Sequence, residues 1–429
     1  MRNVRSALPM VTDPIVEEYV QNLGYRLASH SSNYYRNFHF FVVDSTQINA
    51  FAGPGGYIGI NSGLILAAQS ESEVAAVMAH EIAHVTQRHI ARSIEMQKAL
   101  TIPSMAALLA SLVIATQSSE AGTAAIAATL GGTAQKQINF IRQNEKEADR
   151  VGIQTLADAG FDPFGMPLFF GRLQKNAKLY GTRPPEFLST HPVTLNRISE
   201  ATTRAESYPR VPQYTNLDFL LIQAKLRAND YKNPKQVLAD VRRYKGKGGG
   251  KAAVDQYEFA LLLSLTENHA AARKVMEKLQ KGDPDRIAYR LALARIMTAT
   301  KDYDAALQVY ADTLELYPGE MTVALPYANT LLSSGQLSEA YTLLNKVAET
   351  NPSSPRLHKL LAQAAGATGH KVRTHTAMAQ YYFLNGYTDQ AIEQLKLAEK
   401  SPLLTSYQIA RIQARISDLE RLLELEKLE

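Results

Sequence analysis

The chain has no cysteine among its 429 residues. Disulfides and thiolate metal ligands are therefore excluded, so any metal ion must be bound by histidine and carboxylate side chains. The lack of cysteine does not fix the cellular compartment. No apolar signal core follows Met1, which indicates either a cytoplasmic protein or the mature form of an exported one.

The chain also lacks a concentration of charge of one sign. Its 46 Lys and Arg residues and 41 Asp and Glu residues leave a net charge of +5, spread along the sequence without a basic stripe. Nucleic acid is therefore not expected as a partner, and anionic surfaces are only weakly indicated. With 45% hydrophobic residues, a chain of this length can bury more than one core, and we expect two domains.

The apolar runs are too short to span a bilayer comfortably, because a spanning helix needs roughly 20 apolar residues. The nearest approach is a pair of small-residue-rich stretches, 101–116 and 121–134, with a turn expected at 117–122. Two interpretations stay open for residues 101–134. They form a buried helical hairpin beside the functional site, or a pair of helices that contacts a membrane surface or a flexible partner.

The most informative feature that is present is the motif His80-Glu81-Ile82-Ala83-His84. Residues 73–79 before it contain no Gly or Pro and favour a helix. Two histidines four positions apart lie on one helix face, so both rings can bind one metal ion while Glu81 faces the water beside it. This spacing is typical of zinc hydrolases. The alternatives are a helix that merely carries two polar histidines and a structural zinc site, which generally fills all four positions and prefers cysteine.

A catalytic zinc usually has three protein ligands and one open position, so a third ligand is required. His89 follows His80 by nine residues and would face the opposite side of one continuous helix, so we exclude it. The extended motif H-E-x-x-H-x-x-G-x-x-H also fails, because Gln87 and Ile90 occupy its Gly and His positions.

Better candidates for the third ligand lie in the polar segment 144–150. Glu145 and Asp149 are four residues apart and share a helix face, so one can ligate zinc while the other accepts a hydrogen bond from a ligand imidazole. The alternative, which composition alone favours, is a solvated acidic and basic helix surface.

The segments before the metal motif predict a helix followed by a small sheet. Residues 13–29 have Pro14 in the first turn and apolar residues at helical spacing. The β-rich runs 38–43, 48–52 and 57–60 predict three strands.

From about residue 215 the sequence changes to helices with internal self-similarity. A small alanine recurs at intervals of 34, 34 and 51 residues, and a proline follows the first three alanines by twelve residues. These positions are Ala272, Ala306, Ala340 and Ala391, with Pro284, Pro318 and Pro352. A period of 34 residues with these two anchors predicts tetratricopeptide repeats, in which the alanine allows two helices to pack closely and the proline ends the second helix.

The order of motifs carries a resemblance. The H-E-x-x-H stretch is followed by Glu145-x-x-Ala148-Asp149 and then by His191-Pro192, with Arg197 six residues after the histidine. This order resembles the zinc endopeptidases related to HtpX, a family with integral and periplasmic members. With the appended repeats, the whole chain is similar to the periplasmic, repeat-containing proteases of that family.

The resemblance implies a fold, a domain order and a compartment. The fold is mainly α with a small β-sheet (α+β): an HExxH, gluzincin-like metallopeptidase domain over residues 1–210, then a tetratricopeptide-repeat α-solenoid over residues 215–429. It also implies export to the periplasm, with the signal segment absent from this sequence.

The resemblance also implies a ligand set. It places one Zn²⁺ per chain on His80, His84 and Glu145, with Glu81 as the general base and Asp149 as a hydrogen-bond partner behind the ligands.

Two further positions match a pair that the family places near the metal. His191 and Arg197 are implied in oxyanion stabilisation, and His191 can also occupy the fourth position on zinc as a latch. Taken alone, a histidine before Pro192 is more typical of a loop residue than of a functional group. The sequence leaves the choice between these roles open.

The segment Asn49-Ala50-Phe51 resembles the substrate-binding edge strand of the family. An extended peptide added there is held mainly by backbone hydrogen bonds, which suits unfolded substrates of varied sequence. The alternative is an ordinary solvent-facing edge.

Two functions stay open at this point. The first is a zinc endopeptidase that acts on misfolded or stalled outer-membrane proteins, with the repeats recruiting substrates and contacting the outer-membrane assembly machinery. The second is an assembly chaperone or adaptor with a latent protease site, which His191 on zinc or the 101–134 hairpin keeps inactive.

Overall fold

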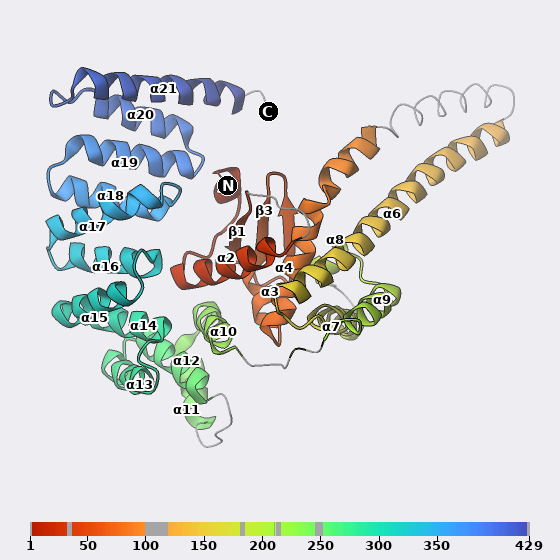
Figure 1. The fold of residues 1–429 in the computed structure, drawn as a ribbon, viewed down its shortest axis with the longest axis horizontal. Coiled ribbons are helices and arrows are strands. Elements are labelled where there is room, and N and C mark those ends of the chain that lie inside the picture. The colour runs from red at the N-terminus through yellow and green to blue at the C-terminus, as the bar shows by residue number, and fades with distance from the viewer. Residues whose placement is uncertain are drawn as a thin grey trace. The chain divides into compact units, whose positions relative to one another are not determined.

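A computed structural model describes residues 2–31, 37–98, 119–180, 185–209, 211, 216–244 and 252–426. The chain forms two compact units (Figure 1). Tyr19–Phe219 make the first, here called the sheet unit, and Met1–Glu18 together with Leu220–Glu429 make the second, here called the repeat unit. The predicted class, mainly helical with one small sheet, is confirmed. The linear domain boundary near residue 215 stays a prediction.

The predicted first helix and the three strands are confirmed, with small shifts in their ends. Helix α2 is Pro14–Ser29, and the strands are β1 (His39–Val43), β2 (Ala50–Gly53) and β3 (Tyr57–Asn61). Helix α2 begins where it does because the Asp13 carboxylate accepts hydrogen bonds from the backbone N–H groups of Ile15 and Val16. The strand order is β1-β3-β2, with β1 parallel and β2 antiparallel to β3.

The sheet depends on a glycine at its centre. The rings of Phe41 on β1 and Phe51 on β2 meet edge to face above β3, with 5.9 Å between their centroids. A Cβ atom at Gly59 would lie 2.5 Å from the Phe51 ring and 2.8 Å from the Phe41 ring, closer than real contacts allow. Only glycine lets both rings cover the middle strand.

Helix α4 (Glu71–Thr86) carries the HExxH motif and is buried on almost every side. It follows the short helix α3 (Ser62–Ala67). Arg88 has a left-handed backbone conformation, with φ 58°, and helical residues resume at 89–98. The helix that carries the motif is therefore interrupted immediately after it.

Helix α6 (Ser119–Asp158) lies beside α4 in its C-terminal half, and its N-terminal half extends away from the sheet (Figure 1). Gly152 permits the close approach, because a Cβ atom there would lie 3.1 Å from the backbone nitrogen of His80. Residues 134–139 and 141–143 are exposed, whereas Glu145 and Asp149 are buried. The segment predicted from composition to be a solvated surface therefore has one buried face.

The sequence interpretation of residues 101–134 is partly wrong. Residues 119–122, where a turn was expected, belong to α6, and residues 121–134 continue without interruption into the helix that carries Glu145. The first stretch, 101–116, lies outside the described residues. Among the helices that the structure describes, none has the length and apolar character of a bilayer span.

Three further helices complete the sheet unit: α7 (Gly165–Tyr180), α8 (Glu186–Thr190) and α9 (Leu195–Ala205). Gly165 is required at the start of α7, because a Cβ atom there would lie 2.4 Å from the backbone oxygen of Ser72. Helix α9 begins at a cap in which the Thr194 hydroxyl accepts a hydrogen bond from the backbone N–H of Arg197. This cap fixes the first turn, from which the Arg197 side chain extends.

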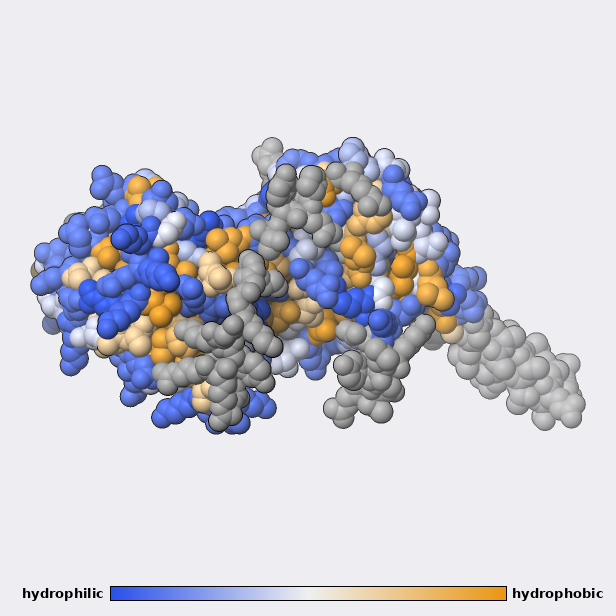
Figure 2. Space-filling view, turned by 90° about the horizontal axis from the view of Figure 1, so that it is seen from below, coloured by the Kyte–Doolittle hydropathy of each residue, from blue (hydrophilic) through white to orange (hydrophobic). Residues whose placement is uncertain are grey.

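The repeat unit is built from short helices, and from residue 234 onward each helix packs against the next one along the chain. They are α1 (Arg2–Ala7), α10 (Leu217–Asp230), α11 (Pro234–Tyr244), α12 (Ala252–Leu265), α13 (His269–Gly282), α14 (Ile287–Ala299), α15 (Tyr303–Leu316), α16 (Met321–Ser333), α17 (Leu337–Thr350), α18 (Pro355–Ala367), α19 (Lys371–Leu384), α20 (Thr388–Glu399) and α21 (Ser406–Glu426). In the space-filling view of the molecule in Figure 2, hydrophobic residues are scattered among hydrophilic ones.

The recurrent alanines have the packing role predicted for them. Each is the fourth residue of its helix and is 0% exposed, and these residues are Ala272, Ala306, Ala340 and Ala391. The recurrent prolines each follow a helix end by two residues. The interval of 51 residues arises because Ala391 belongs to α20, one helix later than the position that continues the period of 34.

A second periodic feature was not foreseen from the sequence. Residues with positive φ recur every 34 positions between paired helices, at Glu267, Lys301, Gly335 and Gly369. The inter-helix turn requires a left-handed residue, which glycine supplies easily and other residues only with strain. Because two of the four positions are not glycine, the pattern is invisible to a search for turn residues.

Candidate metal centre

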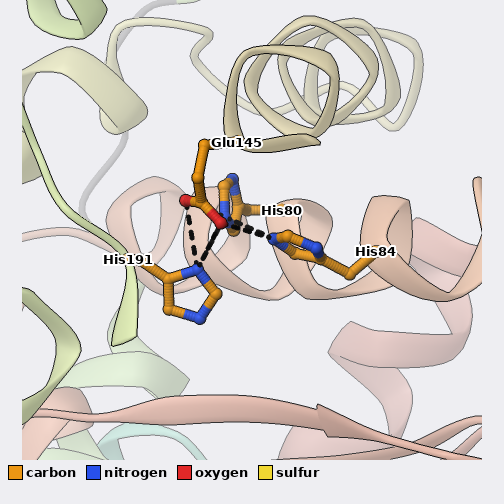
Figure 3. Close-up of side chains that lie close together, drawn as sticks. All are labelled: His80, His84, Glu145 and His191. Carbon is orange, nitrogen blue, oxygen red and sulfur yellow. Dashed lines mark hydrogen bonds and ion pairs between the residues drawn. The ribbon is translucent and has the colours of Figure 1, made fainter. Parts of the chain in front are cut away.

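Four side chains from three segments of the sheet unit converge on one point. His80 and His84 come from α4, Glu145 comes from α6, and His191 follows α8 (Figure 3). One ligand atom from each residue lies within 4.8 Å of all the others. The structure therefore brings together the three predicted ligands and the predicted fourth.

The chemistry of these atoms fits a divalent cation. The Nε2 atoms of His80 and His84 are 3.0 Å apart, and the Nδ1 atom of His191 lies 3.1 Å from both carboxylate oxygens of Glu145. Burial opposes ionisation of Glu145, but hydrogen bonds from His191, His80 and His84 hold its pKa well below the usual range. Three imidazoles and one ionised carboxylate form a donor set that Zn²⁺ accepts.

The carboxylate of Asp149 orients the first ligand from behind. It lies 3.0 Å from the Nδ1 atom of His80, so that Nε2 faces the centre. Burial lowers the pKa of His80, but Asp149 and Glu145 outweigh it and raise this pKa to about 10. Burial raises the pKa of Asp149, and the hydrogen bonds from His80 and Arg197 more than reverse this. Asp149 therefore remains ionised behind the ligand.

Arg197 joins the two carboxylates of α6. Its Nε and Nη2 atoms donate to Asp149 at 2.7 and 2.8 Å, and Nη1 donates to Glu145 at 2.8 Å and to the Pro192 carbonyl at 2.9 Å. Burial lowers the pKa of Arg197, but Asp149 and Glu145 raise it overall. These contacts engage all three of its side-chain nitrogens. The predicted oxyanion role stays a prediction.

Glu81 lies next to the ligand set without belonging to it. Its side chain is 1% exposed, and its Oε1 atom is 3.5 Å from the Nε2 atom of His191. Within the described part of the chain, no hydrogen bond to this oxygen is formed. A buried carboxylate with a free acceptor atom beside a metal site is suited to take a proton from water.

His191 sits between the ligands and Glu81. Its Nδ1 atom faces Glu145 and His80, while its Nε2 atom faces Glu81. The ring stacks on Phe187 with 4.9 Å between centroids and an interplanar angle of 27°. The backbone N–H of His191 donates to the Phe187 carbonyl at 2.7 Å, which ties the histidine to the end of α8.

His89 lies outside the ligand set, but the continuous helix assumed in excluding it was wrong. The interruption at Arg88 turns the chain, so His89 does not face away and its Nδ1 atom lies 2.9 Å from the Nδ1 atom of His84. Burial and the neighbouring His84 lower the pKa of His89 to about 4. His89 is outside the ligand set but touches a ligand. No Gly or Pro marks the break, so the sequence carried no local signal for it.

The segment Asn49-Ala50-Phe51 lies at the edge of the sheet. Asn49 is buried, and its carbonyl accepts a hydrogen bond from the Asn61 backbone N–H. Backbone groups alternate direction along an antiparallel strand, so the groups of Ile48 and Ala50 point away from β3. The Phe187 backbone N–H donates to the Ile48 carbonyl at 3.1 Å. The segment that carries His191 is therefore bonded to the outer side of this strand.

Comparison with known families matches both parts of the chain. Residues 14–205 match Peptidase family M48, and residues 297–364 match a tetratricopeptide repeat family. The first match contains every residue of the site described above.

Comparison with curated proteins extends over almost the whole chain. The beta-barrel assembly-enhancing protease of Escherichia coli (strain K12) is 36% identical over 425 residues, covering 99% of this chain and 87% of that protein. The protein of the same name from Yersinia pestis is 33% identical over 425 residues, with the same coverage. The mitochondrial metalloendopeptidase OMA1 of Arabidopsis thaliana is 33% identical over 151 residues, which is 35% of this chain and 28% of that protein.

Proposed function

This chain belongs to the family of beta-barrel assembly-enhancing proteases, a metallopeptidase with tetratricopeptide repeats, and on that premise we propose that it is a zinc-dependent endopeptidase for misfolded or stalled outer-membrane proteins. The observation that carries the proposal is the convergence of His80, His84, Glu145 and His191 beside the buried Glu81. These residues support a hydrolytic reaction but do not by themselves identify the substrate.

The donor set supports zinc as the metal, held by His80, His84 and Glu145. When bound, Zn²⁺ polarises a scissile carbonyl and lowers the pKa of a coordinated water molecule towards roughly 7. Asp149 fixes the ring of His80, and Arg197 holds Asp149 and Glu145 in place and offsets part of their charge.

Glu81 performs the proton transfers in this proposal. Its buried Oε1 atom, which accepts no hydrogen bond from the described residues, takes a proton from the attacking water and later delivers it to the leaving amine. Glu81 is adjacent in sequence to His80 and rigidly placed by α4, so its distance from the reacting atoms is fixed by the helix. Its removal should therefore affect turnover and leave the ligand set unchanged.

The outer edge of β2 is the proposed binding strand for substrate. The groups of Ala50 point outward, as described above, and an extended chain can pair with them irrespective of its side chains. This suits a protease for unfolded polypeptides. The bond from Phe187 to Ile48 lies on the same edge, so a long substrate strand competes with the segment that carries His191.

One observation favours a second function, an assembly chaperone or adaptor with a latent protease site. His191 places one ring nitrogen in the ligand set and the other next to Glu81, where it occupies the space that water and substrate need. Latency arises if His191 acts as a fourth ligand and is withdrawn only on binding of the correct substrate. The alternative role for His191 is stabilisation of the oxyanion.

The repeat unit supports recruitment of proteins, because repeat arrays present extended surfaces for binding other chains. We propose unfolded substrates and the outer-membrane assembly machinery as the partners, and the periplasm as the compartment. The support is the name of the relatives, which concerns the assembly of β-barrels, and the occurrence of transmembrane β-barrels in outer membranes. Peripheral membrane contact through residues 101–134 stays a proposal.

The test of the protease uses the purified full chain and a urea-denatured outer-membrane β-barrel protein. We expect zinc-loaded wild-type protein to cleave it, and Glu81→Gln to lower kcat/KM by about 10²–10⁴-fold at unchanged zinc content. A chelator should abolish cleavage, and added zinc should restore it. Equal behaviour of the wild type and Glu81→Gln would overturn the protease.

His191→Ala separates the two roles of His191. If this residue is a latch, the variant should cleave substrate, or itself, faster than the wild type. If it stabilises the oxyanion, activity should fall by about 10²–10³-fold. If cleavage by the variant does not change while it still promotes barrel assembly, His191 does not hold the protease inactive. The latent-site hypothesis is then wrong.

A further inference from the structure

One ring nitrogen of His84 faces away from the metal centre and contacts a second histidine. The Nε2 atom of His84 is in the ligand set, 3.0 Å from the Nε2 atom of His80. Its Nδ1 atom lies 2.9 Å from the Nδ1 atom of His89, and the Nε2 atom of His89 lies 3.2 Å from the Glu147 carboxylate. His80 contacts the Asp149 carboxylate directly through Nδ1. His84 instead contacts His89, which in turn contacts the Glu147 carboxylate.

Metal binding fixes the position of each hydrogen atom along this chain of contacts. A histidine that binds metal through Nε2 carries its hydrogen on Nδ1, because neutral imidazole has one donor and one acceptor. His84 therefore donates from Nδ1, and the Nδ1 atom of His89 must accept. His89 then carries its own hydrogen on Nε2 and donates it to Glu147. Each contact has one donor and one acceptor, so the network is internally consistent.

The backbone is arranged to make these contacts. Arg88 adopts φ 58°, a strained conformation for a residue other than glycine, and this turn returns His89 towards His84. Glu147 is two residues after Glu145 on α6, so α6 supplies both a metal ligand and the end of the network. Arg92 donates to Glu147 at 2.8 Å and anchors the carboxylate. The side chain of His89 is 3% exposed, whereas that of Glu147 is 28% exposed.

We propose that His89 is a positioning residue that fixes the orientation and tautomer of His84 for metal binding, and that Glu147 in turn fixes His89. The proposal rests on the metal site of the proposed function and adds to it a second route of ligand control. Hydrogen-bond partners behind metal ligands typically contribute about 10–100-fold in metal affinity. His89 supplies this through a neutral ring, so no further negative charge is buried beside Glu145.

The test compares two substitutions at position 89 in the full-length protein. His89→Asn retains an acceptor oxygen near the place of Nδ1, whereas His89→Leu has a similar volume and no acceptor. Zinc affinity is measured by competition with a chromophoric chelator. We expect His89→Leu to weaken binding about 10–100-fold and His89→Asn to restore most of the loss. Glu200→Gln is the matched control, because Glu200 is an exposed carboxylate paired with Lys146 on α6.

A purely structural role for His89 predicts a different result. It would lower the melting temperature of the metal-free protein in both variants and leave their zinc affinities equal to that of the wild type, which overturns the proposal. If His89→Leu does not fold, Glu147→Ala carries the test, because it changes a partly exposed residue. A few-fold loss of affinity relative to Glu200→Gln supports the proposal, and equality with that control contradicts it.

A spectroscopic readout tests the hydrogen positions directly. In protein labelled with ¹⁵N at its ten histidines, long-range ¹H–¹⁵N correlations identify the tautomer of each ring. We expect the zinc-loaded wild type to show His84 with its hydrogen on Nδ1 and His89 with its hydrogen on Nε2. His89 with hydrogen on Nδ1 overturns the proposal. A wild type that binds no zinc at all overturns the proposed function, and this outcome is recognised before any variant is made.

Discussion

In the sheet unit, four buried ionisable residues from α4, α6 and α9 form one network, in which His80 and Arg197 each contact both Glu145 and Asp149. In the repeat unit, the recurrent buried positions are alanines at the same place in successive helices. The site residues have partners 46 to 111 positions away in the chain. Repeat alanines such as Ala340 and Ala391 instead pack in cores formed by helices that follow one another in the sequence. Mutations in the polar network should therefore lower metal affinity, whereas mutations at the repeat alanines should lower only the stability of the repeat unit.

The largest effect is expected from a substitution in the polar network of the sheet unit. Asp149→Asn removes the charge that orients His80 and pairs with Arg197, and we expect metal affinity to fall about 10–100-fold. Arg197 would then keep one carboxylate partner in a buried place, so the sheet unit should also lose stability. Chelator competition and thermal unfolding measure the two effects. Asp158→Asn, an exposed residue of the same helix, is the control, and equal behaviour of both variants would contradict the network.

The next effect tests the modular packing. Ala272→Leu adds three carbon atoms at a position that is 0% exposed, and we expect a loss of about 1–3 kcal/mol in the free energy of unfolding of the repeat unit. Ala271→Leu adds the same atoms at an exposed position of the same helix and should change little. Urea unfolding followed by circular dichroism measures both. Metal affinity should not change in either variant, because the metal centre lies entirely within the sheet unit.

A smaller effect concerns Glu17, a partly buried carboxylate of the repeat unit. Burial raises the pKa of Glu17 to about 7, against the opposing charge of Arg356. The folded state favours protonated Glu17, because its pKa there exceeds the usual value of 4.5. The contribution of Glu17 to the free energy of unfolding is therefore complete below pH 4.5 and is lost as pH rises through 7. Glu17→Gln mimics the protonated form and should match the wild type near pH 4.5. At pH 8 it should be more stable by about 1–2 kcal/mol.

Urea unfolding of the wild type and Glu17→Gln across this pH range measures the difference. A constant difference from pH 4.5 to pH 8 would contradict the raised pKa. Glu18→Gln serves as the neighbouring control.

The smallest effect is expected at the inter-helix turns of the repeat unit, where a residue with positive φ is required. Lys301 holds φ 61° at a position where Gly335 and Gly369 occupy equivalent turns. Lys301→Gly should relieve the strain and stabilise the repeat unit by roughly 0.5 kcal/mol, after the extra chain entropy of glycine is subtracted. Lys301→Ala keeps the Cβ atom and should not stabilise. A gain of equal size in both variants would point to the lysine side chain and away from the backbone.

The sequence by itself determined the features that depend on neighbours along the chain. The pairing of His80 with His84 follows from helical spacing, and the periodic alanines follow from a unit that repeats itself, so both were predicted from residues alone. Glu145 and Asp149 were candidates by spacing, and only the resemblance to a family preferred them to an exposed helix surface. The strands were found because their β-rich runs are short and bounded by turn residues.

The tertiary structure decided everything that depends on where distant segments meet. The contact of His89 with His84 required a left-handed residue that no local signal announces. It overturned the assumption of a continuous helix, although His89 stays outside the ligand set. The placement of Arg197 behind two carboxylates required α9 to begin beside α6. Helical periodicity fixes which face a side chain occupies, but the partner on that face is set by packing between segments, which a local pattern does not encode.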